Sequence, residues 1–313
     1  MSERALLCIH ALTGMHPGSG TALGTVDLPI QRERHTGWPV IPGSSLKGVL
    51  RDECRRAVAD ATWSGDLVKA NTEDPQLTAV FGPAKVEADT SFAGSLSVTD
   101  ARILAFPVRS LVGVFAWVTC PAVLERLQRD LSYVAQAGDS AQAAAAWPGG
   151  IPTPAQGQAV CSAGSPLLID GTEMVLEEFE FTRSEQSESA PIADWIVGLV
   201  KDETTKARLA MCLVILHNDD FQHFVAHATE VVARVGLDCE SKTAKSTALF
   251  YEEYLPPETL FYSLVAADAR HTGGASMSAG EVLEFLKKNV PPFIQIGADE
   301  TIGKGICAVN LVK

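Results

Sequence analysis

Two patterns of hydrophobic and polar positions alternate along the chain. Short runs of apolar residues, and runs in which every second residue is apolar, are typical of β-strands. They predict strands at 5–11, 95–105, 110–119, 230–237, 249–255, 260–266, 293–296 and 306–312, and a hairpin over 167–181 that turns at Asp170-Gly171. In the second pattern apolar residues recur every three or four positions, which is typical of amphipathic helices.

This helical spacing predicts a second set of elements. Helices are expected from Ser44 or Ser45 to 58, from Pro121 to 134, over 195–209, from a cap at 218–220, and from Ser278 to 288, with a short helix or turn at 77–82. The run 209–216 fits a strand or a helix end, whereas 63–78 and the Ala-, Gly-, Pro- and Ser-rich 137–165 are expected to be irregular. This order predicts an α+β fold with a mostly antiparallel sheet.

The helix after Pro42-Gly43 has a basic face. Lys47, Arg51 and Arg55 are spaced four residues apart, so they share a side of the helix away from the apolar stripe. Ser44 or Ser45 is the expected N-cap. A free helix N-terminus with two hydroxyl groups and a basic row behind it suits an anion such as phosphate. An ordinary solvated charged face is the alternative.

Composition bounds the class of protein. The 313 residues are 46% hydrophobic and 20% charged, enough for one large domain or a domain with insertions. The formal net charge of −13 argues against nucleic acid as a partner. However, residues 31–56 contain six Lys and Arg against three Asp and Glu, a local charge of +3. The field in a groove follows the local charge, so RNA binding stays possible.

Cysteine and histidine spacing indicates no structural metal. The seven cysteines are scattered without a CxxC pair, so reduced cysteines in the core are expected. His223 and His227 are four residues apart but lack the Glu of a HExxH motif. No apolar run is long enough to span a bilayer and no signal pattern opens the chain, so a cytoplasmic location is expected.

A glycine-rich loop contains the candidate chemistry. Four glycines between positions 14 and 24 surround His16, and Asp27 follows. A ribonuclease that activates a ribose 2′-hydroxyl needs a proton acceptor and a stabilised oxyanion. Asp27 suits a base or a divalent-metal ligand, and His16 suits an acid, a base or a phosphate contact. A turn-capping Asp is the structural alternative.

The amino-acid sequence of this region resembles that of a known family. The segment MHPGSG…TVDLPIQRERHTGWPVIPGSSLKGVLR resembles the RAMP proteins of CRISPR systems, especially the repeated backbone subunit of the type III-B (Cmr) effector complex. Residues 95–121, 249–263 and 296–306 are similar to further segments of that family. The resemblance implies a single RAMP-type domain over 1–313, with an RRM-like (ferredoxin-like) palm, an inserted finger region and a thumb hairpin with its tip at 237–248.

The resemblance also implies a function. The chain would bind guide RNA (crRNA), polymerise with copies of itself, join other Cmr-type subunits away from any membrane, and cleave the paired target RNA. Asp27 matches the cleavage residue and His16 the loop histidine. Candidate RNA contacts are Arg32, Arg34 and His35 at the scissile phosphate; Ser44, Ser45, Lys47, Arg51 and Arg55 on the guide backbone; Lys242 and Lys245 on the thumb; and Gly303, Lys304 and Gly305.

Expected products are a 2′,3′-cyclic phosphate and a 5′-hydroxyl. A divalent ion, Mg or Mn, is the expected cofactor, with Asp27 as a ligand and no organic cofactor. Three alternatives stay open: a non-catalytic crRNA scaffold, a guide-processing endoribonuclease of the same superfamily, and an acidic α+β protein with no RNA role. The loop 297–305 is not a P-loop, because Lys304 is followed by Gly305 and a strand, so a structural turn is its alternative.

Overall fold

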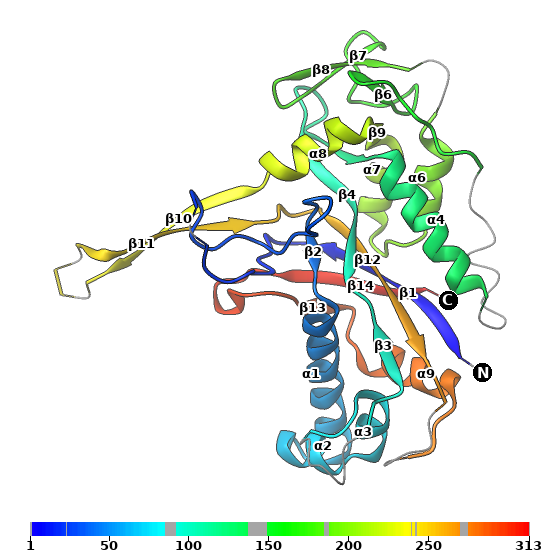
Figure 1. The fold of residues 1–313 in the computed structure, drawn as a ribbon, viewed down its shortest axis with the longest axis vertical. Helices are drawn as coiled ribbons and strands as arrows, with labels where there is room; N and C mark the ends of the chain where they lie inside the picture. Colours follow the sequence, from blue (N-terminus) through cyan, green and yellow to red (C-terminus); the bar gives the residue numbers. More distant parts are fainter. Residues whose placement is uncertain are drawn as a thin grey trace.

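A computed structural model describes residues 2–22, 24–84, 92–136, 149–184, 188–238, 240–241, 243–269 and 275–312, with the backbone alone at 244–248. One large sheet runs through this part of the chain in the order β13-β14-β1-β12-β4-β5-β9-β6-β8-β7, with β2 beside β4 and β3 beside β12 (Figure 1). Its pairings are antiparallel except for β5 with β9 and β6 with β8. The predicted α+β fold with a mostly antiparallel sheet is confirmed.

The strands of this sheet are β1 (Glu3–Ala11), β2 (Val40–Ile41), β3 (Leu96–Val98), β4 (Ala101–Arg109), β5 (Phe115–Thr119), β6 (Gln158–Val160), β7 (Glu173–Leu176), β8 (Phe179–Arg183), β9 (Leu213–Leu216), β12 (Leu260–Ala267), β13 (Phe293–Gln295) and β14 (Ile306–Val312). The helices are α1 (Gly43–Thr62), α2 (Leu67–Glu73), α3 (Pro75–Phe81), α4 (Pro121–Ala135), α6 (Ala190–Val197), α7 (Glu203–Cys212), α8 (Asn218–His227) and α9 (Ala279–Asn289).

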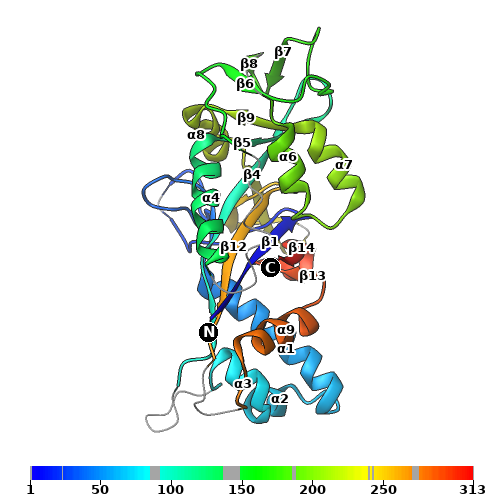
Figure 2. The same cartoon turned by 90° about the vertical axis from the view of Figure 1, so that its right-hand side faces the viewer.

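Helices cover both faces of the central strands (Figure 2). On one face, Asp130 of α4 accepts hydrogen bonds from Arg102 of β4 and from the Tyr262 hydroxyl of β12. On the other face, Leu7 of β1 lies with Leu50 of α1 and Leu286 of α9. Residues 5–11 of β1 are all buried, because this strand lies between two neighbours and two helical layers.

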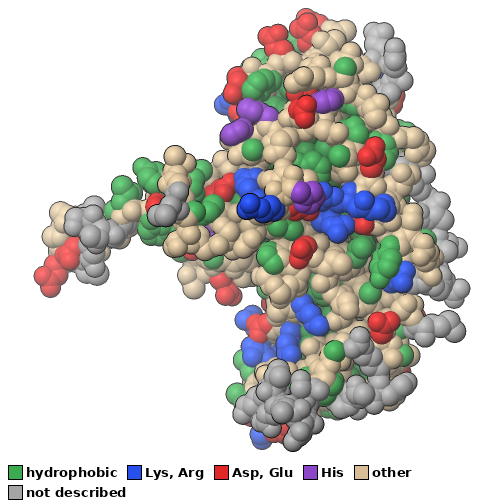
Figure 3. Space-filling model, in the orientation of Figure 1, with side chains coloured by type: hydrophobic (Ala, Val, Ile, Leu, Met, Phe, Trp, Pro, Cys, Tyr) green, Lys and Arg blue, Asp and Glu red, His purple; other side chains and the backbone are tan. Residues whose placement is uncertain are grey.

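A two-stranded arm projects from this body. It consists of β10 (Glu230–Leu237) and β11 (Ala244–Tyr254), which pair antiparallel (Figure 1). Hydrophobic side chains gather over the arm (Figure 3), among them Val231, Val235 and Leu249, each exposed by about half. An exposed apolar ribbon of this kind favours contact with another molecule. The predicted thumb tip at 237–248 falls on this arm.

Several sequence predictions are confirmed. Ser278 and Glu281 form the predicted capping box of α9, α4 begins at Pro121, and β10 and β14 have the predicted bounds. The cysteines within the described residues are free and buried, whereas Cys239 lies outside them. Residues 137–148 of the predicted insertion also lie outside the described residues. In the rest of that insertion, 149–165, only residues 158–160 form a strand.

Other predictions are wrong for local reasons. The supposedly irregular 63–78 forms α2 and most of α3, because the carboxylates of Asp66 and Asp74 cap them. The strand at 95–105 is interrupted between β3 and β4, and the strand at 110–119 begins only at Phe115, since Gly113 and Val114 have positive φ. The helix at 195–209 is divided between α6 and α7. The run 209–216, expected to be a strand or a helix end, contains the end of α7 followed by β9, so both alternatives are present.

Three turn and cap predictions also fail. The hairpin turns between β7 and β8 at Glu177, whereas Asp170-Gly171 makes an earlier turn. The cap of α8 is His217, whose side chain accepts a hydrogen bond from the Asp219 N–H. Neither Ser44 nor Ser45 caps α1: the helix begins at Gly43, and Pro42 before it makes no side-chain cap.

In the described part of the chain, no helix has the length and apolar character needed to cross a membrane.

Candidate functional site

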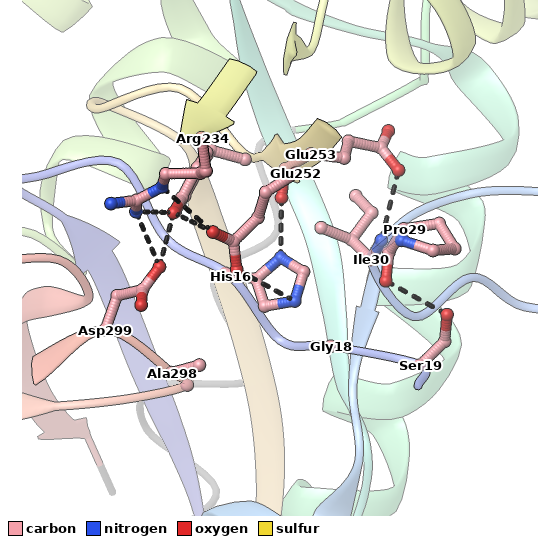
Figure 4. A network of polar contacts seen from close by, with 12 residues as sticks. His16, Gly18, Ser19, Pro29, Ile30, Arg234, Glu252, Glu253, Ala298 and Asp299 are labelled. Atoms are coloured by element: carbon pink, nitrogen blue, oxygen red, sulfur yellow. Dashed lines mark hydrogen bonds and ion pairs between the residues drawn. The ribbon is translucent and has the colours of Figure 1, made fainter. Parts of the chain in front are cut away.

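His16 lies buried beneath the glycine loop, with 4% of its surface exposed. Its Nδ1 is 2.6 Å from the carbonyl oxygen of Glu253, and its Nε2 is 3.6 Å from a carboxylate oxygen of Glu252 (Figure 4). A Cβ at Gly18 would come within 2.6 Å of Nε2, so any larger residue there would require the imidazole or the loop to shift. Because both ring nitrogens face β11, this geometry favours a structural role for His16 over contact with a substrate.

The C-terminal glycine loop, residues 297–305, interlocks with this first loop. The Ala298 N–H donates to the His16 carbonyl at 2.9 Å, and the Gly305 N–H donates to the Gly14 carbonyl at 2.9 Å. Gly297 and Gly305 have positive φ, and a Cβ at Gly297 would come within 2.5 Å of the His16 carbonyl oxygen. The segment therefore acts as a brace, in agreement with the structural alternative.

Within this segment, Gly303 and Lys304 are more accessible than Gly305, which is buried. The Lys304 ammonium lies 4.6 Å from the centre of the Tyr254 ring, an arrangement that favours a cation–π contact.

A charged cluster joins the arm to the same brace (Figure 4). Arg234 contacts the Glu252 carboxylate at 3.2 Å and the Asp299 carboxylate at 2.9 Å. The Tyr254 hydroxyl donates to Glu252 at 2.6 Å and also lies against Asp299. Burial raises the pKa of Asp299, but the Tyr254 hydroxyl and the Arg234 charge outweigh it and hold that pKa below its ordinary value.

Glu253, the next residue of β11, is buried and holds the segment that follows the glycine loop. Its carboxylate accepts hydrogen bonds from the Ile30 N–H at 3.0 Å, from Arg32 at 2.6 Å and from Thr229 at 2.8 Å. Arg32 also donates to the carbonyl oxygens of Gly37 and Val225. The protein itself thus engages Arg32, so its predicted phosphate contact would require these bonds to be exchanged.

Asp27, by contrast, is exposed. One carboxylate oxygen, Oδ2, accepts the Tyr251 N–H at 2.8 Å. The N–H groups of Asp27 and Leu28 both donate to the Tyr251 carbonyl, at 3.1 and 3.0 Å, and the Glu253 N–H donates to the Leu28 carbonyl at 3.0 Å. Asp27 therefore lies on a short extended segment added to the base of β11, within three residues of the contacts of His16.

Asp27 offers a divalent ion one free carboxylate oxygen. The second carboxylate oxygen, Oδ1, has no hydrogen-bond partner among the described residues. No group of three or more His, Cys, Asp or Glu side chains in the described ranges is arranged to hold a metal. A single hard oxygen suits Mg²⁺, which typically takes one or two carboxylates and completes its shell with water and substrate phosphate.

The tip of the loop, Arg34 and His35, is exposed, with His35 at 74%. Arg126 of α4 contacts the residues on both sides of this tip, Glu33 and Trp38. Glu33 makes a bidentate pair with Arg126 of α4 at 2.7 and 3.1 Å, and Arg126 lies 4.9 Å from the centre of the Trp38 ring. Burial raises the pKa of Glu33, but hydrogen bonds from Arg126 and Thr36 keep it below its ordinary value. Lys and Arg side chains gather across the middle of this face (Figure 3).

The N-terminus of α1 is less available to an anion than expected. The Gly43 N–H donates to the Asp100 carboxylate at 2.7 Å. A Cβ at Gly43 would come within 2.7 Å of the Val98 carbonyl oxygen, so glycine is needed there. The hydroxyl-bearing Ser44 and Ser45 are exposed beside it. The prediction of a free helix end is wrong, because a carboxylate already takes its first N–H.

The basic row of α1 is half-buried rather than fully solvated. Lys47 donates to the Leu96 carbonyl at 2.7 Å, and Arg51 donates to Asn71 at 3.2 Å. Burial, with the nearby charge of Arg55, lowers the pKa of Arg51, while Arg55 pairs with Asp52. On the arm, Lys242 and the side chain of Lys245 lie outside the described residues.

Sequence reasoning missed the residues that organise this site: Arg234, Glu252, Glu253, Tyr254 and Asp299. One signal was present, since adjacent glutamates in the apolar run LFYEEYL place one carboxylate on each face of a strand. Burying both requires partners on both faces. The partners themselves come from distant segments, so only the fold identifies them.

Comparison with known proteins identifies relatives that match almost the whole chain. A relative from Pyrococcus furiosus, the CRISPR system Cmr endoribonuclease Cmr4, is 37% identical over 98% of this chain and 95% of its own length. The crystal structure of oligomeric Cmr4 from the same organism is similar, with a TM-score of 0.70, 30% identity, and coverage of 99% of this chain and 98% of that one. A type III-B Cmr-beta structure bound to cognate target RNA shares the fold, with a TM-score of 0.69, 20% identity, and coverage of 98% and 96%.

A family profile, that of the RAMP superfamily, matches residues 8–308. With its glycine loops, its arm and its sheet, the chain belongs to the RAMP superfamily.

Proposed function

We propose that this chain is the guide-RNA-binding backbone subunit of a type III-B CRISPR ribonucleoprotein and that each copy cuts the paired target RNA through Asp27. One observation carries the cutting role: the Asp27 carboxylate is exposed, yet a hydrogen bond from the Tyr251 N–H orients it at the base of the arm. The name of the Pyrococcus furiosus relative, an endoribonuclease, supports this role. The similar crystal structure from Pyrococcus furiosus is of oligomeric Cmr4, which supports self-association of this chain.

We interpret the central sheet as an RRM-like (ferredoxin-like) palm. Strands β14, β1, β12 and β4 are neighbours in that order, and α1 follows β1 while α9 follows β12. A ferredoxin-like core has a helix after its first and third strands, which supports the interpretation. The arm then corresponds to the thumb, and the region from β5 to α8 to the finger insertion.

In the proposed reaction the ribose 2′-oxygen attacks the adjacent phosphorus. Asp27 accepts the 2′-hydroxyl proton, the bond from phosphorus to the 5′-oxygen breaks, and water protonates that leaving oxygen. The products are a 2′,3′-cyclic phosphate and a 5′-hydroxyl. An in-line arrangement of the attacking and leaving oxygens is required. The arm is the element that would displace a nucleotide to achieve it, through its exposed apolar side chains.

A divalent ion is part of the proposal. Asp27 would hold it through the oxygen that Tyr251 leaves free, together with phosphate oxygens of the RNA. When bound, the ion would supply charge stabilisation at the scissile phosphate. The protein's own part is to fix the carboxylate with β11 and to keep His16 and Arg32 within the scaffold.

The exposed polar and charged side chains are the first candidates for contact with the guide RNA. Arg34, His35, Ser44 and Ser45 are accessible as they stand, whereas Lys47 and Arg51 must exchange internal hydrogen bonds to reach a phosphate. Contacts to phosphate do not depend on sequence, which suits a subunit that accepts any guide. A cytoplasmic location follows from this role.

The test is cleavage by the ribonucleoprotein assembled with Asp27→Asn subunits. Cleavage should disappear while crRNA binding stays intact. Retained cutting would leave the chain as a crRNA scaffold. Incubation of the chain with precursor RNA tests whether the chain is a guide-processing endoribonuclease. Such an enzyme would cut the precursor RNA in the absence of any target.

A further inference from the structure

Strand β10 of the arm is exposed along most of its length. Within Glu230–Leu237, every residue is exposed except Arg234 and Gly236, which are half-buried. The Arg234 guanidinium reaches the Asp299 carboxylate of the C-terminal brace at 2.9 Å (Figure 4). The hydroxyl of Tyr254, a buried residue of β11, lies against the same carboxylate. Asp299 therefore joins both strands of the arm to the brace.

Asp299 has an unusual backbone conformation and directs its carboxylate to the arm. Its φ of 65° lies in the left-handed region, which Asp and Asn tolerate better than most other residues. It directly precedes the short 3-10 helix η2 (Glu300–Ile302), but its side chain makes no cap hydrogen bond there. The N–H of the preceding residue, Ala298, donates to the His16 carbonyl, so the glycine loop fixes the backbone next to Asp299. The carboxylate thus holds the arm instead of capping its own helix.

The base of the arm is held on both of its faces. The strand register places Arg234 and Tyr254 on one face of the two-stranded ribbon, and this face meets the brace. Glu253 lies on the opposite face, where its carboxylate accepts hydrogen bonds from the segment that follows Asp27. A ribbon held from one side can pivot about that contact, whereas a ribbon held from both sides has a fixed direction. The contacts of Asp299 supply the second restraint.

We propose that Arg234 and Asp299 are positioning residues for target cleavage, because together they fix the direction of the arm relative to Asp27. This inference rests on the proposed cutting role, in which the arm displaces a nucleotide of the paired target. In-line attack requires the displaced backbone to lie in a narrow range of positions beside the carboxylate. A pivoting arm would meet that requirement for only part of the time, so the cutting step would slow. Guide binding would persist, since neither residue is among the candidate guide contacts.

Asp299→Asn tests the restraint with little change of shape. Asparagine also tolerates the left-handed conformation, and it keeps an acceptor oxygen but loses the charge that attracts Arg234. In the assembled ribonucleoprotein, kcat for target cleavage should fall about tenfold, with KM and crRNA affinity within about twofold, because misplacement affects the transition state. Glu188→Gln is the matched control: it neutralises a carboxylate that pairs with Arg183 away from the arm, and kcat should stay unchanged.

The direction of the arm can be measured in the full-length chain without RNA. Spin labels on Leu237→Cys of the arm and Val68→Cys of α2, both at exposed positions, report the distance from arm to body by pulsed electron paramagnetic resonance. The natural cysteines of the described residues are buried, and Cys239→Ser removes the remaining one. The distance distribution should become about twice as broad in Asp299→Asn, because the arm then pivots, and should not change in Glu188→Gln.

The two measurements separate this inference from the proposed cutting role. An unchanged distance distribution in Asp299→Asn would overturn the restraint, whatever happens to cleavage. A broader distribution with unchanged kcat would overturn the positioning role. Retained cleavage in Asp27→Asn would instead remove the cutting assignment and would leave the distance distributions as they are.

Arg234→Gln is the second variant. Combined with Asp299→Asn, it should lower kcat no further than the stronger of the two single variants, because both residues act through one contact. Losses of kcat that multiply in the double variant would show that the two residues act separately and would overturn the pair.

Discussion

Asp27 and Tyr251, 224 positions apart in the chain, hydrogen bond to each other in both directions. The Tyr251 N–H donates to the Asp27 carboxylate at 2.8 Å, and the Asp27 N–H donates to the Tyr251 carbonyl at 3.1 Å. The first bond orients the side chain and the second fixes its backbone. The position of the proposed cutting residue thus depends on the base of the arm, near the end of β11.

Replacing Asp27 by Asn tests the chemistry with little change of shape. The amide oxygen can still accept the Tyr251 N–H, but the group no longer takes a proton. Target cleavage by the assembled ribonucleoprotein should fall at least about 100-fold, the lower range of general-base contributions. Guide affinity should change less than twofold. Cleavage within a factor of two of the unaltered complex would remove Asp27 from the mechanism.

Glu253→Gln tests positioning of the segment that contains Asp27. Glutamine has one acceptor oxygen for three donors, so the hold on Ile30 and Arg32 weakens. We expect a loss of about 2 kcal/mol in the free energy of unfolding. The kcat for target cleavage should fall about tenfold or more, with KM nearly unchanged, because misplacement affects the transition state.

Glu178→Gln, in the exposed turn between β7 and β8, is the matched control. It should leave stability and kcat within error. An equal effect of both variants on kcat would indicate a general loss of charge instead of positioning.

Gly18→Ala tests the fit of His16 beneath the loop. The added Cβ would come within 2.6 Å of the imidazole Nε2, so the ring or the loop must move. We expect a destabilisation of about 1–3 kcal/mol in chemical denaturation, the range for overpacking. Gly24→Ala is the control: its Cβ would have its nearest neighbour at 4.0 Å, and its stability should change by less than about 0.5 kcal/mol. Equal stability of the two variants would contradict the fit described here.

Arg34→Ala tests the exposed tip as an RNA contact. Each phosphate contact to a single strand contributes about 0.7 to the slope of log affinity against log salt. The variant should lower that slope by about this amount. Arg109→Ala removes an equal charge from a side chain that is 74% exposed and pairs with Glu177, and the slope should stay the same. Identical slopes for Arg34→Ala and the unaltered chain would assign Arg34 to solvent.

Glu33 gives the chain a predictable pH dependence. Its folded pKa lies below the ordinary value of 4.5, so the unfolded state binds more protons in this range and stability rises with pH. The contribution is present above about pH 4.5 and is lost as pH falls through the folded pKa. Glu33→Gln should therefore destabilise most near neutral pH and progressively less below pH 4.5, as measured by urea unfolding.

Arg126→Met completes a double-mutant cycle with Glu33→Gln. In that background, the effect of Glu33→Gln should depend less on pH, because the Arg126 contacts no longer lower the Glu33 pKa. An unchanged pH dependence would assign the shift to other groups.

Sequence patterns correctly predicted those structural features that depend on residues close together in the chain. The capping box at Ser278, the bounds of β10 and β14, and the loop position of Asp27 follow from spacing and turn chemistry. The hairpin turn at Glu177 could not be predicted in this way, because its φ of 50° is rare for a residue with a side chain, and Asp170-Gly171 had the better turn sequence.

The polar partners of the site lay beyond such reasoning. Sequence patterns placed Arg32 and His16 on a loop, and the family resemblance implied contact with RNA. Only the return of β11 past that loop shows that Glu253 holds Arg32 and that His16 faces Glu252. Contacts between residues more than 200 positions apart depend on topology, which no local pattern encodes.

The interlock of the two glycine loops joins segments that lie far apart in the chain. The Gly305 N–H donates to the Gly14 carbonyl and the Ala298 N–H donates to the His16 carbonyl, so each contact closes a loop of about 280 to 290 residues. Such contacts form only after the entropy of closing that loop has been lost, which makes them slow to form. The brace beneath the loop that precedes Asp27 should therefore be among the last parts of the fold to form during refolding.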